Sequence, residues 1–403
     1  MKILVFYPYI PWPLDRGTFQ RTFHLLRALA AEHDVDFVAL AENGEGTEHA
    51  HIFEQFCRRV EFIPFHHPRW QRLLGGRIAN PLPSNIAHWT SEKVRERLAA
   101  LLAEGHYDHV HVCDIALAQY FTGPLRKERL SVDRSRVDLQ FQLMEHRTLG
   151  LPFGTKVLRC ESYAKLWFYE RKISQRAALQ VVCGPDDEMF IRRRIRKRTA
   201  VAVVGNGVDL SFFTPEAVVT PRAEIPTLLF CGAMDYSPNV DALRFWFGDI
   251  HDRVVARIPN LRVLLVGKSP TPEVFAYGAR EGVTVTGTVP DVRPYYREAW
   301  AQIVPLRIGG GTRLKIPESM AMGTPVVSTT IGAQGLNLRH GDEILLGNTP
   351  SQFAAETVRI LTEATLRQTI CENGLITVRE RFSWERIGQQ FRNAFKTHLT
   401  SSL

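Results

Sequence analysis

Short apolar runs alternate along the chain with stretches in which apolar residues recur at helical spacing. In the first half we expect strands at residues 3–7, 35–40, 60–64, 110–113, 179–183 and 201–204. Between them, helical spacing predicts helices near 19–30, 91–104, 115–122 and 157–178. Alternation of strands and helices is typical of a parallel sheet whose strands are joined by crossover helices.

The same pattern begins again after a proline-rich segment at residues 215–226, which predicts a linker. Strands are expected at 228–231, 263–266, 283–286, 301–305 and 326–328, and helices at 239–258, 292–299, 313–322, 350–364, 366–380 and 384–398. The pattern therefore predicts an α/β protein with two doubly wound parallel-sheet domains facing a cleft. Ligands of such sheets bind beyond the carboxyl ends of the strands.

Composition and charge narrow the class of protein. The chain has 403 residues, 45% of them hydrophobic and 23% charged, which is typical of a soluble globular protein of two or three domains. The net charge of +8 favours an acidic partner: a nucleotide, a phosphate, an anionic membrane surface or a nucleic acid. The charge alone does not choose among these partners.

The six cysteines are dispersed, with no CxxC pair, which fits reduced thiols in a cytoplasmic protein. The apolar run at residues 3–6 is too short for a signal peptide, so we expect none. No window of 18 apolar residues occurs, so we expect no membrane-spanning helix.

Residues 305–318 carry the strongest chemical signal. A predicted strand ends, Gly309, Gly310 and Gly311 follow, and a helix is predicted from residue 313. Glycines let a backbone approach a ligand closely, and a helix N-terminus attracts an anion. We expect Arg313 and Lys315 to add charge in the first turn of that helix.

Glu318 follows about one turn into the same predicted helix, where its carboxylate can accept two ribose hydroxyls. The segment therefore predicts a site for a nucleotide diphosphate that carries a sugar. The alternative is a flexible loop followed by a solvated basic turn.

Other ligand classes are disfavoured by the spacing of the motifs. The glycine segment is not a P-loop, and Gly205-Asn206-Gly207 lacks the third glycine of a dinucleotide fingerprint. Asp34-Val35-Asp36 leads into a strand rather than following one, so we expect no catalytic metal. His109 and His111 share one face of a strand but lack an evident third metal ligand.

Four segments of the chain resemble one enzyme family: GAMDYSPNVDA at 232–242, VTGTVPDVRPY at 285–295, ESMAMGTPVV at 318–327, and NGVD at 206–209 with Phe213 and Pro215. The chain is similar to retaining glycosyltransferases of family 4, which have the GT-B fold. It resembles in particular the branch associated with exopolysaccharide and exosortase loci.

The resemblance implies roles for the residues of a donor site in the second domain. Glu318 would bind the ribose, and Gly309, Gly310, Gly311 and Thr312 would line the diphosphate and the transferred sugar. Gly287 and Val289 would face the base through their backbone. The implied donor-binding set is Gly232, Gly287, Val289, Gly309, Gly310, Gly311, Thr312, Arg313, Lys315 and Glu318.

The chain departs from the family pattern in two places. The first glutamate of the family motif is replaced by Gly310, and the usual arginine and lysine after the first strand of the second domain are replaced by residues 234–239. Because a diphosphate still needs compensating charge, Arg313 and Lys315 are the expected substitutes.

In the first domain the candidate catalytic residues are Arg16, Gly17 and His111. Gly17 follows the first strand in a loop that faces the catalytic cleft in the resembled family, and Arg16 and Arg21 add charge. His111 matches a family position near the sugar. The alternatives are a tight proline-rich turn for the loop and a core histidine for His111.

Two basic clusters remain. One is Arg192–Arg198, with six cations in seven positions, and the other combines Arg69, Trp70, Arg72 and Arg77. Cations interleaved with Trp and Leu suit an anionic membrane surface or a lipid-diphosphate acceptor, and a solvated basic surface is the alternative. No nucleic-acid-binding motif accompanies the charge, so we expect no nucleic-acid partner.

From this pattern we expect a glycosyltransferase that moves a sugar from a nucleotide-sugar donor to a hydroxyl of a glycan or lipid-linked acceptor. The resemblance implies retention and a role in surface or exopolysaccharide biosynthesis. No cofactor is expected because the nucleotide sugar is a substrate. We expect a cytoplasmic protein, held peripherally at the inner face of the membrane.

The expected domains are residues 1–215 on the acceptor side and 222–383 on the donor side, with 384–403 packing back on the first. Two alternatives remain. One is a non-hydrolysing nucleotide-sugar epimerase, and the other is a catalytically idle GT-B binding partner.

Overall fold

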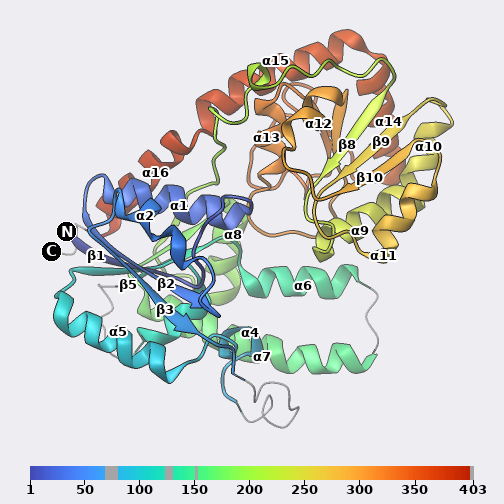
Figure 1. The fold of residues 1–403 in the computed structure, drawn as a ribbon. Coiled ribbons are helices and arrows are strands. Elements are labelled where there is room, and N and C mark those ends of the chain that lie inside the picture. The colour runs from blue at the N-terminus through green and yellow to red at the C-terminus, as the bar shows by residue number, and fades with distance from the viewer. Residues whose placement is uncertain (69–79, 123–129, 150–152, 400–403) are drawn as a thin grey trace. The chain divides into compact units, whose positions relative to one another are not determined.

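The computed structural model describes residues 1–68, 80–122, 130–149 and 153–399. The chain divides into two compact units, residues 1–205 with 387–403, and residues 206–386. Each unit contains one parallel sheet flanked by helices (Figure 1). The division at residue 205 falls ahead of the proline-rich segment 215–226.

The first unit contains a seven-stranded sheet with the order β3-β2-β1-β4-β5-β6-β7. The strands are β1 (Lys2–Tyr7), β2 (Asp34–Glu42), β3 (Arg59–Phe65), β4 (His109–Val112), β5 (Leu130–Arg134), β6 (Leu179–Val182) and β7 (Val201–Val203). Every pairing in it is parallel. The carboxyl ends of all seven strands therefore lie along one edge.

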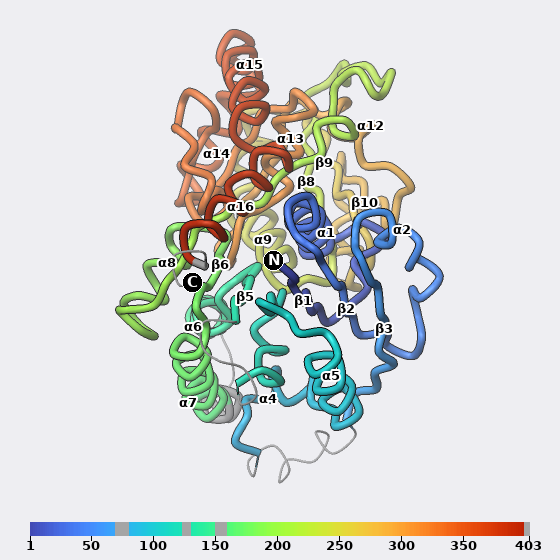
Figure 2. Tube along the Cα trace, turned by 90° about the vertical axis from the view of Figure 1, so that its left-hand side faces the viewer, coloured from blue at the N-terminus to red at the C-terminus, as the bar shows by residue number. Residues whose placement is uncertain are grey.

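The helices of the first unit connect these strands. They are α1 (Gly17–Ala30), α2 (Ala50–Glu54), α4 (Ser84–Ala87), α5 (Glu92–Gly105), α6 (Asp138–Thr148), α7 (Phe153–Arg176) and α8 (Pro185–Phe190), with the 3-10 helices η1 (Thr47–His49) and η3 (Ile115–Tyr120) and the π-helix η5 (Ile191–Ile195). Helices α6 and α7 lie side by side (Figure 2). The last helix, α16 (Trp384–Leu399), contributes residues 387–399 to this unit.

Strand β4 shows how the sheet faces are covered. Val110 and Val112 join a buried cluster with Leu98 of α5, whereas the rings of His109 and His111 contact Phe395 on α16. Side chains alternate across a strand, so α5 and α16 cover opposite faces of this sheet. The end of the chain thus completes the core of the first unit.

The second unit contains a six-stranded parallel sheet with the order β10-β9-β8-β11-β12-β13. The strands are β8 (Thr227–Cys231), β9 (Arg262–Val266), β10 (Val283–Gly287), β11 (Ala301–Val304), β12 (Val326–Ser328) and β13 (Leu345–Leu346). Its helices are α9 (Ser237–Phe245), α10 (His251–Val255), α11 (Pro272–Ala276), α12 (Arg293–Glu298), α13 (Lys315–Ala321), α14 (Pro350–Thr362) and α15 (Ala364–Arg381), with η6 (Pro215–Ala217), η7 (Trp246–Ile250) and η8 (Tyr277–Ala279).

The predicted fold class of two parallel-sheet α/β domains is confirmed, as are the predicted strands. Several elements were not predicted, among them the strands β5 and β13 and the helices α2, α4, α6, α8 and α11. The prediction of a helix from residue 313 is wrong, because α13 begins at Lys315 and Arg313 precedes it. The predicted helix 239–258 is three consecutive pieces, α9, η7 and α10.

Candidate functional site

The loops that follow β8 and β11 contact each other at the carboxyl edge of the second sheet. Gly232 follows β8 with φ +153°, and a Cβ there would lie 2.8 Å from Nδ2 of Asn239 and 2.9 Å from Nζ of Lys315. Asn239 belongs to α9 and Lys315 begins α13. Glycine at position 232 therefore leaves room for an amide and an ammonium group.

The ammonium of Lys315 is the cation at this position. It donates a 2.9 Å hydrogen bond to Oδ1 of Asn239 and lies 4.6 Å from the ring centroid of Phe230. Asn239 is itself oriented by a 2.7 Å hydrogen bond from Nδ2 to the carbonyl of Ala233. Burial lowers the pKa of Lys315 to about 8, so the ammonium is charged at neutral pH.

Arg313 folds back over the glycine segment. Its Nη1 donates hydrogen bonds to the carbonyls of Gly310 and Gly311, the latter at 2.8 Å. A Cβ at Gly309 would lie only 1.5 Å from Nη2 of Arg313. Arg313 therefore binds the backbone of the glycine segment. It precedes α13, which begins at Lys315, and so does not lie in the first helical turn as predicted.

Thr312 ties the glycine segment to the start of the second unit. The backbone N–H of Asn206 donates to Oγ1 of Thr312 at 3.2 Å, and Nδ2 of Asn206 donates to its carbonyl at 3.4 Å. Gly311 has φ +67°, a left-handed conformation that favours glycine. These contacts fix the path of the loop between β11 and α13.

Glu318 lies in the first turn of α13 and is half-buried. The hydroxyl of Tyr296 donates to its Oε2 at 3.4 Å. Burial raises the pKa of Tyr296 far above its ordinary value, so the phenol keeps its proton and remains a donor. The carboxylate is thus positioned from one side by α12.

Arg307 and Asp241 form an ion pair that the sequence analysis did not identify. Nη2 of Arg307 lies 2.6 Å from Oδ1 of Asp241, whose side chain is 3% exposed, and Nε donates to Oδ2 at 3.1 Å. The usable signal was two polar residues, Asn239 and Asp241, in the helix directly after the first strand of the unit. Both contact the segment that follows β11.

Gly287 and Val289 lie at the same carboxyl edge of the second sheet, at the end of β10. Gly287 ends β10 with φ +69°, and no atom beyond its two chain neighbours lies within 4 Å of where its Cβ would be. Val289 is half-buried. Strand order places β10 two strands from β8, so a ligand that reaches from Gly232 to Gly287 would extend across β9.

In the first unit, Gly17 begins α1 and Arg16 precedes it. The Arg16 side chain is 56% exposed, with its guanidinium 3.8 Å from the Asp15 carboxylate and 5.0 Å from the Phe19 ring centroid. Both residues lie in the connection after β1, at the carboxyl edge of the first sheet. This exposed position leaves Arg16 accessible to a ligand.

His111 has the surroundings of a core histidine, the alternative that the sequence left open. It is 1% exposed, Nδ1 lies 2.8 Å from Oγ of Ser131, and its ring packs against Phe391 and Phe395. Burial lowers the pKa of His111 to about 4. The imidazole is therefore neutral at ordinary pH.

The basic cluster at 69–77 lies outside the described residues. Within the described part of the chain, no group of three or more His, Cys, Asp or Glu side chains is arranged to hold a metal ion. The described helices include none with the length and apolar character needed to cross a membrane.

Residues 225–363 match the family model of group 1 glycosyl transferases. The chain is 28% identical to a D-inositol 3-phosphate glycosyltransferase from Salinispora arenicola, over 81% of this chain and 77% of that protein. It is 21% identical to an uncharacterized 44.6 kDa protein in the cps region of Klebsiella pneumoniae, over 98% and 99% of the two chains.

Two solved structures share the fold over both full lengths. Sucrose-phosphate synthase from Thermosynechococcus elongatus matches with a TM-score of 0.73 at 19% identity. The Anabaena protein Alr3699/HepE, solved in complex with UDP-glucose, matches with a TM-score of 0.67 at 14% identity. These likenesses show the GT-B fold, and the family match and relatives support a glycosyltransferase of group 1.

Proposed function

We propose that this protein transfers a sugar from a nucleotide-sugar donor, bound by the second unit, to a hydroxyl of an acceptor. The observation that carries the proposal is the ammonium of Lys315 beside Gly232 and Asn239, at the edge where ligands of such sheets bind. The match of residues 225–363 to the group 1 family model supports the same assignment of the donor to this unit.

The diphosphate would lie between Gly232 and the glycine segment 309–311. Lys315 supplies a positive charge there, which opposes the negative charge of the phosphates and of the departing nucleotide diphosphate. Arg313 holds the carbonyls of Gly310 and Gly311 and so shapes the loop that approaches the ligand. We propose that these cations take the place of a metal ion.

The ribose would be bound by Glu318, whose carboxylate accepts hydrogen bonds from two hydroxyls. The base would reach Gly287 and Val289, where the positive φ and open space at Gly287 leave the backbone accessible. The Anabaena protein that shares the fold was solved with UDP-glucose, which makes UDP sugars the first donors to test.

The acceptor would bind the first unit, with Arg16 and Gly17 as candidate contacts. Retention is proposed on the resemblance to family 4, and a role in surface or exopolysaccharide biosynthesis is supported by the relative from a cps region. Because His111 is buried against α16, we propose that it supports the sheet beneath the site.

A thermal-shift series with UDP, GDP and ADP tests the donor site, because a ligand that binds only the folded state raises the apparent stability. Incubation with the matching nucleotide sugars then tests turnover. Release of nucleoside diphosphate with transfer or hydrolysis of the sugar supports the proposal. Binding without turnover would support an idle partner, and an altered free nucleotide sugar would support an epimerase.

A further inference from the structure

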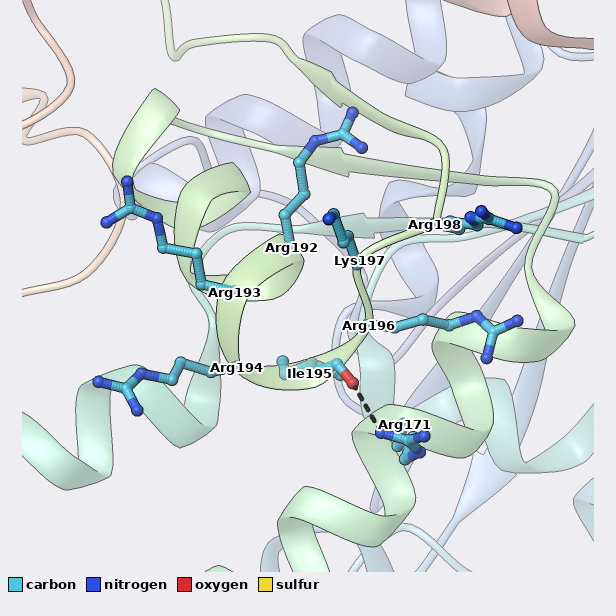
Figure 3. A pocket seen from close by; sticks show the side chains of 8 residues that line it. All are labelled: Arg171, Arg192, Arg193, Arg194, Ile195, Arg196, Lys197 and Arg198. Atoms are coloured by element: carbon cyan, nitrogen blue, oxygen red, sulfur yellow. Dashed lines mark hydrogen bonds between the residues drawn. The ribbon is translucent and has the colours of Figure 1, made fainter.

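Seven cationic side chains line an open hollow on the surface of the first unit (Figure 3). The hollow has a volume of about 940 Å³. We call these side chains the basic surface. Its members are Arg171, Arg192, Arg193, Arg194, Arg196, Lys197 and Arg198. They come from α7, η5 and the segment that leads into β7.

The basic surface lies at the amino end of the sheet. Residues 196–198 directly precede β7, and α7, which carries Arg171, ends just before β6. Gly17 follows β1 and so lies at the carboxyl end. Because all strands are parallel, the basic surface and the Gly17 loop lie at opposite edges of the first sheet.

The backbone beneath the basic surface is held by side chains from its neighbours. Nε1 of Trp167 donates to the carbonyl of Arg194 at 2.8 Å, and Nη1 of Arg171 donates to the carbonyl of Ile195 at 3.4 Å. Nη1 of Arg192 donates to the carbonyl of Thr199 at 3.1 Å. The cations are therefore carried by an ordered turn.

Most of this charge is not compensated within the described part of the chain. Arg192 pairs with Glu188 at 2.7 Å, but no described carboxylate lies within ion-pair distance of Arg193, Arg194 or Lys197. These three side chains are exposed. Like charges gathered at one place repel each other, so an external polyanion would stabilise the arrangement.

The side chains diverge rather than converge. In Figure 3, Arg193 and Arg194 extend to one side of the turn, and Arg196 and Arg198 extend to the other. A single compact phosphate would be met by convergent donors, as in a helix N-terminal anion site. Divergent cations match an extended array of negative charges.

Apolar side chains are exposed beside the cations. Phe168 on α7 is 66% exposed and packs edge-to-face on Trp167 with ring centroids 4.9 Å apart. Phe168, Arg171 and Lys172 are three or four residues apart, so they share one face of α7. Met189 on α8 is also exposed. Cations next to an exposed Phe and Met suit the headgroup region of a bilayer, and no nucleic-acid-binding motif accompanies them.

We propose that the basic surface docks the first unit on a bilayer containing anionic phospholipids, with Phe168 entering the headgroup region. The inference does not rest on the donor site, which lies in the other unit. The candidate acceptor contacts Arg16 and Gly17 lie at the opposite end of the same sheet, so the inference does not rest on the acceptor site either.

The test is sedimentation of the full chain with vesicles of phosphatidylcholine, alone or mixed with an equal part of phosphatidylglycerol. The variant is Arg193→Ser/Arg194→Ser/Lys197→Ser. Its control is Arg27→Ser/Lys93→Ser/Arg257→Ser, which removes three exposed cations elsewhere. The control and the variant therefore have the same net charge. A contribution of about 1 kcal/mol per cation near the surface corresponds to about a fivefold loss of binding for each one removed.

We expect binding to mixed vesicles only, a loss of about a hundredfold in the variant, and little loss in the control. Phe168→Ser should weaken binding more than Phe275→Ser, which replaces an equally exposed Phe of the second unit. Equal losses in the two triple variants, binding that ignores lipid charge, or retention on a duplex oligonucleotide without vesicle binding would overturn the proposal. The thermal shift with a nucleoside diphosphate checks folding, and it should be the same in all variants.

Discussion

The ammonium of Lys315 donates a 2.9 Å hydrogen bond to the amide oxygen of Asn239, 76 residues earlier in the chain. Asn239 belongs to the segment that lacks the expected arginine and lysine. A lysine from α13 therefore reaches the carboxyl end of β8, where those residues would have placed charge. Through this hydrogen bond, the single ammonium of Lys315 serves both the loop after β8 and the loop after β11.

Lys315→Ala should weaken binding of a nucleoside diphosphate and leave binding of the bare nucleoside unchanged. The lost group is a charge-assisted donor, with an expected cost of about 1.5–3 kcal/mol. Calorimetry with UDP and uridine on the same preparations measures both. Equal losses for the two ligands would mean that Lys315 supports the fold of the site rather than the phosphates.

Lys315 also predicts a pH dependence. The pKa of the free protein's ammonium is about 8, below its ordinary value, so its charge is present below pH 8 and lost above it. Diphosphate affinity should therefore fall as the pH rises from 7 to 9. Lys315→Arg keeps its charge over that range. Parallel pH profiles in the two proteins would show that another group titrates.

Glu318→Gln should weaken binding of both the nucleoside and its diphosphate, because each carries the ribose. We expect a loss of about 1.5–3 kcal/mol, the usual range for hydrogen bonds to a charged group. Glu281→Gln, at an exposed position of the same unit, is the control. The prediction is contradicted by a folded Glu318→Gln variant that binds uridine as tightly as the parent.

Gly309 and Arg313 should behave as a coupled pair. Gly309→Ala brings a Cβ into the position of the Arg313 guanidinium, which can move away at little cost in stability but then leaves the carbonyls of Gly310 and Gly311. Arg313→Ala should weaken diphosphate binding more than Arg313→Lys does. In an Arg313→Ala background, Gly309→Ala should add little. If the losses of diphosphate binding free energy are additive in this double-mutant cycle, the two residues are not coupled.

Arg21 and Asp133 form a buried ion pair in the first unit, with hydrogen bonds of 2.8 and 2.6 Å. Removing one partner of such a pair costs about 3–5 kcal/mol, because the other charge is left buried. Urea unfolding should show that loss for Arg21→Met. The double variant with Asp133→Leu should recover part of it, although the carbonyls of Val204 and Gly205 lose their donor.

This pair explains why β5 was not predicted. Leu130–Arg134 contains Ser131, Asp133 and Arg134, so it offers no apolar run, yet the whole strand is buried. Ser131 meets two histidines, Asp133 pairs with Arg21, and Arg134 pairs with Glu170 at 2.9 Å. Each partner lies far away in sequence. Hydrophobic periodicity predicts strands whose neighbours are apolar, and β5 is buried through polar partners.

The candidate site, like the fold, was predictable where its residues stand together in the sequence and was missed where they do not. The glycines of 309–311, Lys315 and Glu318 stand together in one segment, so strand-to-helix spacing sufficed to single them out. Asn239 and Asp241 depend on two loops meeting at a sheet edge, which no local pattern encodes. The start of α13 was set too early because Arg313, a good helix former, is held by carbonyls of the loop.

His111 predicts how stability depends on pH. Its pKa is about 4 in the folded protein, because burial disfavours the imidazolium, and about 6.5 in an unfolded chain. The unfolded state therefore binds a proton first, so the stability from this group is complete above pH 6.5 and is lost as the pH falls toward 4. The full loss is about 3 kcal/mol, with about 2 kcal/mol gone by pH 5.

His111→Asn cannot titrate, so its unfolding free energy in urea should fall less between pH 7 and pH 5. Other histidines contribute equally to both proteins and cancel in the difference. Identical pH slopes would mean that the imidazole gains a proton without leaving the core.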